Sequence, residues 1–337
     1  MNQFLEDVGN RKAFVAGLVA LVGAALALGL AVPFGFATLT EKLPSLSSFL
    51  SVEANELGIN VIYVPAGMLA VTSFCLILEA FLLGYEKSTV KRIIANDTPS
   101  VRTDVFYLLF RVSGLLMVFS LIFSFGSLYV GTGYIKSEYN FAFMAHIDSI
   151  ALQFLALVVA FSFVMYWVHR LVHTKYLWEV HKVHHSAEFY NVLLAYRVHP
   201  VEYIAGSLYG IAIVSILGVK PEAMILWLGA NAVYQSMVHS NYDWEWKWLE
   251  YIFITPAAHR IHHSTDPVHF NANLAILSIW DRMFGTYIAP KGETINLGVP
   301  DADRGNFNTD RFFTEMIACF WRWITLRSPD TGRAVTD

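Results

Sequence analysis

Long apolar runs, separated by short polar stretches, dominate the first half of the chain. They cover residues 13–39, 61–84, 105–130 and 147–168. Each reaches the roughly 20 residues that a helix needs to cross a bilayer. The first run follows two basic residues but exceeds the apolar core of a signal peptide, so we interpret it as a helix. The pattern therefore predicts four transmembrane helices.

Two shorter apolar runs follow between residues 201 and 238, on either side of Gly218-Val-Lys-Pro221. They predict a helical hairpin that either spans the membrane or re-enters it. Residues 308–326 place apolar side chains at helical spacing. This spacing predicts an amphipathic helix that lies on the membrane or packs over the rest of the chain, with a cap at residues 308–310.

The predicted class is an all-α integral membrane protein that forms a single structural unit. Residues 1–146 hold the first three transmembrane helices and their loops. Residues 147–290 form a second region that begins with the fourth transmembrane helix, and residues 291–337 form a tail with the amphipathic helix. Helices beyond the membrane are expected to form a cytoplasmic cap.

The positions of Lys and Arg predict the orientation of these helices. The N-terminal residues and the loop 85–104 carry the basic excess, so both are assigned to the cytoplasm. Four crossings and a returning hairpin then keep the later polar segments on that side. Glu79 and Arg111 lie at similar depths, about 8 and 9 Å from the cytoplasmic ends of their helices, which predicts an ion pair.

Composition agrees with a membrane protein and narrows the chemistry. The chain is 55% hydrophobic and 15% charged, with a mean hydropathy of +0.47, which is too apolar for an ordinary soluble domain. A net charge of −4 gives no reason to expect nucleic-acid binding. The two cysteines, Cys75 and Cys319, form no metal-binding pair.

Histidines gather in three clusters on the predicted cytoplasmic side. Residues three and four apart share a helix face, so each cluster aims its imidazoles at one point. Imidazole is a common neutral ligand of iron, zinc and copper. His146 falls on the opposite side and is excluded. The clusters are His169-x-x-x-His173, His181-x-x-His184-His185 and His259-x-x-His262-His263.

The number of clustered histidines indicates two metal ions, because a structural zinc site needs only four ligands. A zinc protease would need a glutamate at the position that Arg170 occupies. Spacing alone leaves open O2 chemistry on a lipid, hydrolysis, and transport of a divalent metal. A transporter would place its histidines near the middle of the membrane, whereas these follow the apolar runs.

The order and spacing of the clusters resemble the fatty acid hydroxylase / sterol desaturase superfamily of integral-membrane di-iron oxygenases. The resemblance covers residues 150–288, and the first three apolar runs match only as hydrophobic segments. Further similar segments are YWVHR at 166–170, VHHS at 183–186, RVHPVE at 197–202, HSN at 239–241, TPAAHR at 255–260 and WDRMFGTY at 280–287.

The resemblance implies a cytoplasm-facing centre of two iron ions that uses O2 to hydroxylate or desaturate a lipid. Relatives act on sterols, fatty acyl chains, sphingoid bases and alkylglycerols. Zinc is possible in the isolated protein. A separate electron donor is expected, such as cytochrome b5, a ferredoxin or a reductase. The membrane would be the inner membrane of a bacterium or the endoplasmic reticulum of a eukaryote. The alternatives are a zinc hydrolase-like membrane enzyme and a divalent-metal transporter.

The resemblance also assigns roles to individual residues. Three groups are expected to hydrogen bond the ligands, namely His199, Asn273 and Asp243. Asp281 and Tyr287 are expected to be structural, with Arg282 as a partner of Asp281. The expected metal ligands are His169, His173, His181, His184, His185, His239, His259, His262 and His263. His269 is a further candidate ligand. Further candidate hydrogen-bond acceptors are Glu188, Glu202 and Asp266.

Overall fold

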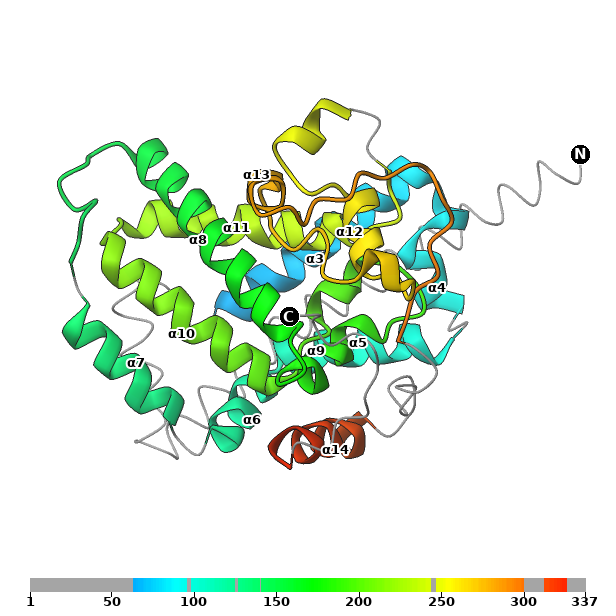
Figure 1. Ribbon diagram of the computed structural model, residues 1–337, viewed down its shortest axis with the longest axis horizontal. Helices are drawn as coiled ribbons and strands as arrows, with labels where there is room; N and C mark the ends of the chain where they lie inside the picture. The colour runs from blue at the N-terminus through cyan, green and yellow to red at the C-terminus, as the bar shows by residue number, and fades with distance from the viewer. Residues whose placement is uncertain are drawn as a thin grey trace, which may run out of the picture.

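The computed structural model describes residues 63–95, 98–124, 127–139, 141–243, 247–299 and 312–325 (Figure 1). Regular structure in these residues is helical, apart from two isolated bridges between Phe253 and Leu277 and between Ser264 and Leu297. The predicted all-α class is confirmed for this part of the chain. The apolar run 13–39 and the helix cap predicted at 308–310 lie outside the described residues.

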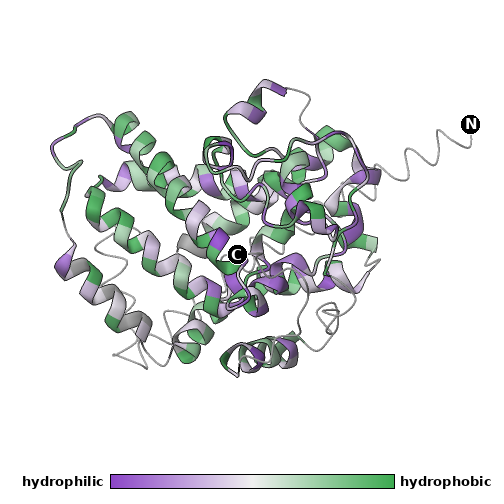
Figure 2. Ribbon diagram, in the orientation of Figure 1, coloured by the Kyte–Doolittle hydropathy of each residue, from purple (hydrophilic) through white to green (hydrophobic). Residues whose placement is uncertain are grey.

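Three of the described helices are long and apolar enough to cross a membrane. They are α3 (Tyr63–Leu83), α8 (Ile150–Val172) and α10 (Pro200–Leu217). Hydrophobic residues dominate α8 and α10 along their length (Figure 2). The helices expected at 61–84 and 147–168 are therefore present, with α8 continuing four residues beyond the predicted end.

The single helix predicted across residues 105–130 is wrong. The structure has three shorter helices there, α5 (Pro99–Val112), α6 (Leu115–Phe123) and α7 (Ser127–Glu138). The first break lies at Gly114, whose φ of 77° is in the left-handed region that ends helices. At nine residues, α6 is about 14 Å long, about half the hydrocarbon thickness of a bilayer.

The polar stretch 85–104 is also more ordered than the expected loop. It holds the short helices η1 (Tyr85–Lys87) and α4 (Thr89–Ala95) and the first turn of α5. Thr98 caps α5 by accepting a hydrogen bond from the Val101 amide, and Pro99 occupies the first helical position. These two signals start α5 before the apolar run begins.

Helix α8 is the central element against which the later long helices pack. Both α10 and α11 (Pro221–Val238) contact α8, and in addition α10 contacts α6 and α7 while α11 contacts α3. Phe161 of α8 stacks on Trp227 of α11 with ring centroids 4.8 Å apart. The two helices of the predicted hairpin therefore share α8 as a neighbour.

The turn between α10 and α11 is fixed by a buried glutamine of α8. Gly218 ends α10 with a φ of 63°, and a Cβ atom there would lie 2.5 Å from the Cα atom of Ala142. Only glycine fits this combination of backbone angle and close contact. Gln153 accepts a hydrogen bond from the Lys220 amide at 2.6 Å, which ties the turn to the start of α8.

The predicted ion pair between Glu79 and Arg111 is wrong. Glu79 is fully buried and accepts hydrogen bonds from the backbone amides of Thr89 at 2.7 Å and Asn241 at 3.3 Å. The Arg111 guanidinium lies over the ring of Tyr203 instead, 5.7 Å from its centroid. The prediction assumed that Glu79 and Arg111 lie at equal depth on two continuous helices. Because the helix breaks at Gly114, Arg111 lies on the shorter helix α5, and this assumption fails.

The histidine-bearing segments gather at one end of the long helices. That end contains the C-termini of α3, α8 and α11 and the N-terminus of α10. More hydrophilic residues concentrate in the loops and short helices there (Figure 2). The short helices in this region are α9 (Trp178–His185), η2 (Val192–Tyr196), η3 (Lys247–Tyr251), α12 (Pro256–His262), η4 (Pro267–His269) and α13 (Ser278–Met283). The amphipathic helix α14 (Phe312–Ile324) packs against α9.

Candidate metal centre

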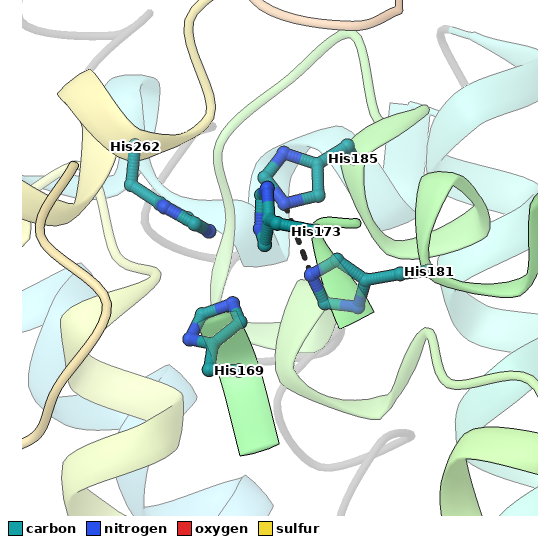
Figure 3. Close-up of side chains that lie close together, drawn as sticks. All are labelled: His169, His173, His181, His185 and His262. Atoms are coloured by element: carbon teal, nitrogen blue, oxygen red, sulfur yellow. Dashed lines mark hydrogen bonds between the residues drawn. The ribbon is translucent and has the colours of Figure 1, made fainter. Parts of the chain in front are cut away.

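The nine histidines expected as ligands form two adjoining groups of buried side chains. Within each group, one ring nitrogen from every residue lies within 4.8 Å of the others. Figure 3 shows the first group with its rings turned toward a common space. The five-histidine group is His169, His173, His181, His185 and His262, and the four-histidine group is His184, His239, His259 and His263.

The ends of the long helices α8 and α11 place three of these rings, and the short helices α9 and α12 place the other six, with adjacent residues serving different groups. His184 and His185 are neighbours on α9 but belong to the four- and five-histidine groups, respectively. His262 and His263 at the end of α12 separate in the same way. Thr255 caps α12, whose first turn begins at Pro256. Because neighbouring side chains on a helix point in different directions, two compact turns can line two adjoining sites.

Five of the nine rings donate their Nδ1–H to a protein oxygen at 2.6 to 3.3 Å, and the His259 ring is also hydrogen bonded to the backbone of Asn273. Carbonyl and carboxylate oxygens can only accept, so the proton is on Nδ1 and Nε2 carries the lone pair. This arrangement orients metal-binding histidines in proteins. The pairs are His169 with Leu274 O (2.7 Å), His181 with Glu202 Oε1 (2.9 Å), His184 with Arg197 O (3.3 Å), His239 with Gln235 O (2.6 Å) and His262 with Ala272 O (2.8 Å).

The inward-facing nitrogens fit a bound cation. The Nε2 atoms of His184 and His239 lie 3.3 Å apart, and both rings have their Nδ1 proton engaged elsewhere. Two lone pairs that face each other repel unless a positive charge lies between them. Nε2 of His169 and Nε2 of His262 are buried without a hydrogen-bond partner. Buried polar atoms in this state are uncommon, and a metal ion would satisfy them.

Burial also keeps the imidazoles in the form that binds metal. It lowers the pKa of His239 to about 4, and it holds the pKa of His184, His185 and His259 well below the usual value. Neighbouring imidazoles add to the effect, because a second positive charge nearby would be repelled. These rings are therefore neutral near pH 7, as metal ligation requires.

The three residues expected to hydrogen bond the ligands lie in different places. Asn273 is beside the site, where its backbone accepts a hydrogen bond from the His259 ring. Asp243 pairs with Arg260 at 3.1 Å, and its side chain is 62% exposed. His199 caps α10 by accepting from the Val201 amide, and its other ring nitrogen donates to Met316 O at 3.0 Å.

The remaining expectations for single residues have clear outcomes. Asp281 is buried, and its partners are the amides of Leu274 and Ala275 and the Thr286 hydroxyl. The expected pair of Asp281 with Arg282 is wrong, because Arg282 stacks on Tyr287, 3.8 Å from the ring centroid. A further histidine candidate, His269, contacts Ser264 Oγ at 3.0 Å. Among the candidate acceptors, Glu202 contacts a ligand candidate, His181.

Two buried residues beside the site were missed from the sequence. Arg197 is fully buried against Asp104 at 2.7 Å, and its carbonyl accepts from His184. Tyr190 lies with its ring against His239 and His263, at centroid distances of 5.7 and 5.5 Å. Arg197 stands in the RVHPVE segment that carries the family resemblance, so a signal existed. Nothing in the sequence around Tyr190 distinguishes it.

Comparison with known proteins identifies the part of the chain that contains these groups. The fatty acid hydroxylase family matches residues 154–286, which hold all nine histidines. This region belongs to the fatty acid hydroxylase / sterol desaturase superfamily. No solved structure matches the chain significantly.

The similar proteins are enzymes of lipid oxidation. Alkylglycerol monooxygenase of Danio rerio is 35% identical over 136 residues, which cover 40% of this chain and 30% of that protein. Ornithine lipid hydroxylase of Rhizobium tropici is 34% identical over 149 residues, covering 43% and 44%. A Delta(7)-sterol 5(6)-desaturase of Aspergillus fumigatus is 26% identical, covering 42% and 39%. The matched region therefore spans less than half of each of these relatives.

Proposed function

We propose that the chain is a membrane-bound di-iron oxidoreductase that uses O2 and external electrons to hydroxylate or desaturate a lipid. The observation that carries this proposal is the pair of adjoining histidine groups, which contain five and four buried imidazoles. An all-nitrogen set suits iron and is also compatible with zinc. The named relatives, a monooxygenase, a hydroxylase and a desaturase, support an oxidation that uses O2.

Each part of the chain has a distinct role in this proposal. The five-histidine group would hold one iron ion, and the four-histidine group would hold a second. Iron would supply the activation of O2 and the oxidation of a C–H bond. The hydrogen bonds at Nδ1 keep rings such as His169 and His262 oriented with Nε2 inward. Burial of the groups would limit the access of water to iron held there.

The proposed substrate is a lipid that reaches the site from the bilayer. Helices α8 and α10 are apolar enough to lie in the membrane, and each has one end at the histidine groups. Relatives at 34% and 35% identity are named for ornithine lipid and alkylglycerol, and the sterol desaturase is at 26%. We therefore rank hydroxylation of an alkylglycerol-type or ornithine-lipid-type substrate ahead of sterol desaturation.

The site would face the cytoplasm and receive electrons from a separate protein. The end of the long helices that carries the histidines also carries the basic residues of 85–104, which favours the cytoplasmic side. The described residues contain two cysteines, both buried and unpaired, so they supply no cysteine cluster for an iron–sulfur centre. A cytochrome b5, a ferredoxin or a reductase would supply the electrons.

Reconstitution with different metals tests this function. The purified chain, loaded anaerobically with Fe²⁺ and given a reductant and an alkylglycerol or ornithine lipid, should consume O2 in proportion to the hydroxylated lipid. The zinc-loaded protein should be inactive, because zinc does not change oxidation state. Lipid turnover without O2, or retained turnover with zinc, would instead support a hydrolase.

Substitution of one histidine from each group provides a second arm of this test. His262→Ala and His184→Ala should each abolish turnover while leaving the protein inserted in the membrane. His146→Ala is the matched control, since this exposed histidine belongs to neither group. Turnover preserved in either group variant would contradict the assignment of ligands.

A further inference from the structure

A short backbone strip, residues 272–274, supplies hydrogen-bond acceptors to both histidine groups. The carbonyls of Ala272 and Leu274 accept from His262 at 2.8 Å and from His169 at 2.7 Å. The backbone of Asn273, between them, accepts from His259 of the four-histidine group. Three consecutive residues thus orient three candidate ligands, two in one group and one in the other.

The strip has an unusual backbone conformation that its own side chain stabilises. Asn273 has a φ of 54°, in the left-handed region that non-glycine residues rarely adopt. Its buried amide donates to Ala258 O at 2.8 Å and to Ile288 O at 2.9 Å, and it accepts from the Ile288 amide. These bonds fix the strip against α12 and the segment that follows α13.

Asp281 binds the opposite face of the same peptide units. Its Oδ2 accepts from the Ala275 amide at 2.8 Å, and that amide shares a peptide unit with the Leu274 carbonyl that holds His169. Its Oδ1 accepts from the Leu274 amide at 2.8 Å, which shares a peptide unit with the Asn273 carbonyl. Each carboxylate oxygen is therefore linked through one peptide unit to one candidate ligand.

The carboxylate has no cation beside it in these contacts. Asp281 is fully buried, and its other bond is to the Thr286 hydroxyl at 2.7 Å. The neighbouring cation, Arg282, is turned away onto Tyr287 and the Glu250 carbonyl. A buried carboxylate is costly, and an apolar side chain would fill the space at lower cost. Its negative charge is therefore directed at the two peptide units.

We propose that Asp281 is a positioning residue that orients and polarises His169 and His259, one in each histidine group, through two consecutive peptide units. Hydrogen bonds in a chain polarise one another, and a charged member strengthens the rest. An anion at the N–H side makes the carbonyl a better acceptor. The carbonyl in turn makes the imidazole a stronger donor to metal. This inference rests on the proposed metal centre.

Metal binding to the full chain, with Co²⁺ as the probe, tests the proposal without relying on turnover. Asp281→Asn keeps the shape but removes the charge and presents an amide N–H to one backbone N–H. We expect two Co²⁺ sites to remain, with the affinity of both lowered about 10- to 100-fold. The midpoint potential of the iron-loaded variant should move to more positive values, because less negative charge reaches the ligands.

Arg282→Gln is the matched control for these measurements. It changes the charge of the adjacent residue, whose contacts are with Tyr287 and Glu250 rather than with the strip. Its Co²⁺ affinities and potential should equal those of the wild type. Unchanged affinities in Asp281→Asn, or equal losses in Arg282→Gln, would overturn the proposal.

A second variant covers the case in which Asp281→Asn does not accumulate as folded protein. Asn273→Gly permits the left-handed backbone but removes the bonds to Ala258 and Ile288. It should lower Co²⁺ affinity at least about tenfold, and wild-type affinity would overturn the role of the strip. A wild-type chain that binds no metal would overturn the proposed function itself. If the wild type binds two ions and both variants bind them with the same affinities, this inference alone would be overturned.

Discussion

At the scale of single residues, the candidate metal centre depends on oxygen atoms that hold the histidines as much as on the histidines themselves. Glu202 differs from the other acceptors because it is a side chain and lies on α10, a helix apolar enough to cross the membrane. Its carboxylate accepts from His181 at 2.9 Å. It therefore links a membrane helix directly to the five-histidine group.

Removing this carboxylate should weaken one metal site and spare the other. Glu202→Ala takes the acceptor from His181, so Co²⁺ affinity at the five-histidine site should fall about 10- to 100-fold. Affinity at the four-histidine site should stay unchanged. Glu222→Gln, an exposed acid at the start of α11, is the control. Equal losses at the two sites would show that Glu202 acts through overall stability.

His199 should make the stability of the protein depend on pH although it is not a candidate ligand. Burial lowers its pKa from 6.5 to about 4, so the unfolded chain takes up a proton before the folded one does. The stabilisation is complete above pH 6.5 and is lost as the pH falls toward 4, amounting to about 2 kcal/mol between pH 7 and pH 5.

Comparison with a substituted protein isolates this contribution. His199→Asn keeps a residue that can cap α10 but removes the titrating ring. Thermal unfolding in detergent should show that the difference in stability between wild type and variant shrinks as the pH is lowered from 7 to 5. A difference that is the same at both pH values would contradict the prediction.

At the residue level, the histidines that lie together in the structure were predictable from the sequence, whereas most of the groups that orient them were not. The nine histidines of the two groups are the eight that the sequence clusters supply and His239, which the family resemblance added. The acceptors of their Nδ1 protons are mostly backbone carbonyls, for example those of Leu274 and Gln235, which any residue could supply. The sequence therefore gives no signal for these carbonyls. It predicted Asp243 as a hydrogen-bond partner of a ligand, whereas the structure pairs the exposed Asp243 with Arg260.

At the scale of elements, one buried ion pair connects α5 to the segment that follows η2 and contacts His184 of α9. Arg197 follows η2, and its guanidinium binds Asp104 of α5 at 2.7 Å and Ser186 Oγ at 2.9 Å. Its carbonyl holds His184. The helix α5, which the apolar pattern assigned partly to a membrane span, therefore supports the segment that orients His184.

Removing one partner of the Arg197–Asp104 pair should lower the stability of the protein far more than replacing both partners with apolar side chains. Arg197→Met leaves the Asp104 carboxylate buried without its cation, which should lower the free energy of unfolding by about 3–5 kcal/mol. The double variant Arg197→Met with Asp104→Leu should recover most of that loss, since two apolar groups pack without a charge. Thermal unfolding of the single and double variants measures this. A double variant no more stable than Arg197→Met would contradict the argument.

Element boundaries were predictable to within three or four residues where one uninterrupted apolar run has the length of a membrane span, as for α8. The error at residues 105–130 has a local cause, because Gly114 adopts a left-handed angle within an apolar run. Hydropathy averages over such a residue, whereas the backbone turns at it. The mistaken pair of Glu79 and Arg111 follows from the same error, since it assumed two continuous helices.

At the scale of the whole molecule, the helix ends that meet at the histidines define one side of the protein. Glu79 at the end of α3 binds the Asn241 amide, and His239 at the end of α11 meets His184 of α9. The turn between α10 and α11 lies at the other end, where Lys220 pairs with Asp148. This arrangement predicts which residues face the cytoplasm.

Labelling of introduced cysteines tests this orientation. The side chain of Asp148 is 99% exposed and that of Glu86 is 59% exposed, while both native cysteines are buried. In intact cells, Asp148→Cys should react with a membrane-impermeant maleimide, and Glu86→Cys should react only after permeabilisation. The wild-type chain provides the unlabelled background. The reverse pattern would place the metal centre on the outer side.

The central claim is that each histidine group holds one metal ion, and metal stoichiometry tests it most directly. Titration of the purified apoprotein with Fe²⁺ under anaerobic conditions should give two ions bound per chain. The variants His262→Ala and His184→Ala, one from each group, should each retain about one tightly bound ion. A wild-type chain that binds a single ion or none, or variants that both keep two, would contradict the account.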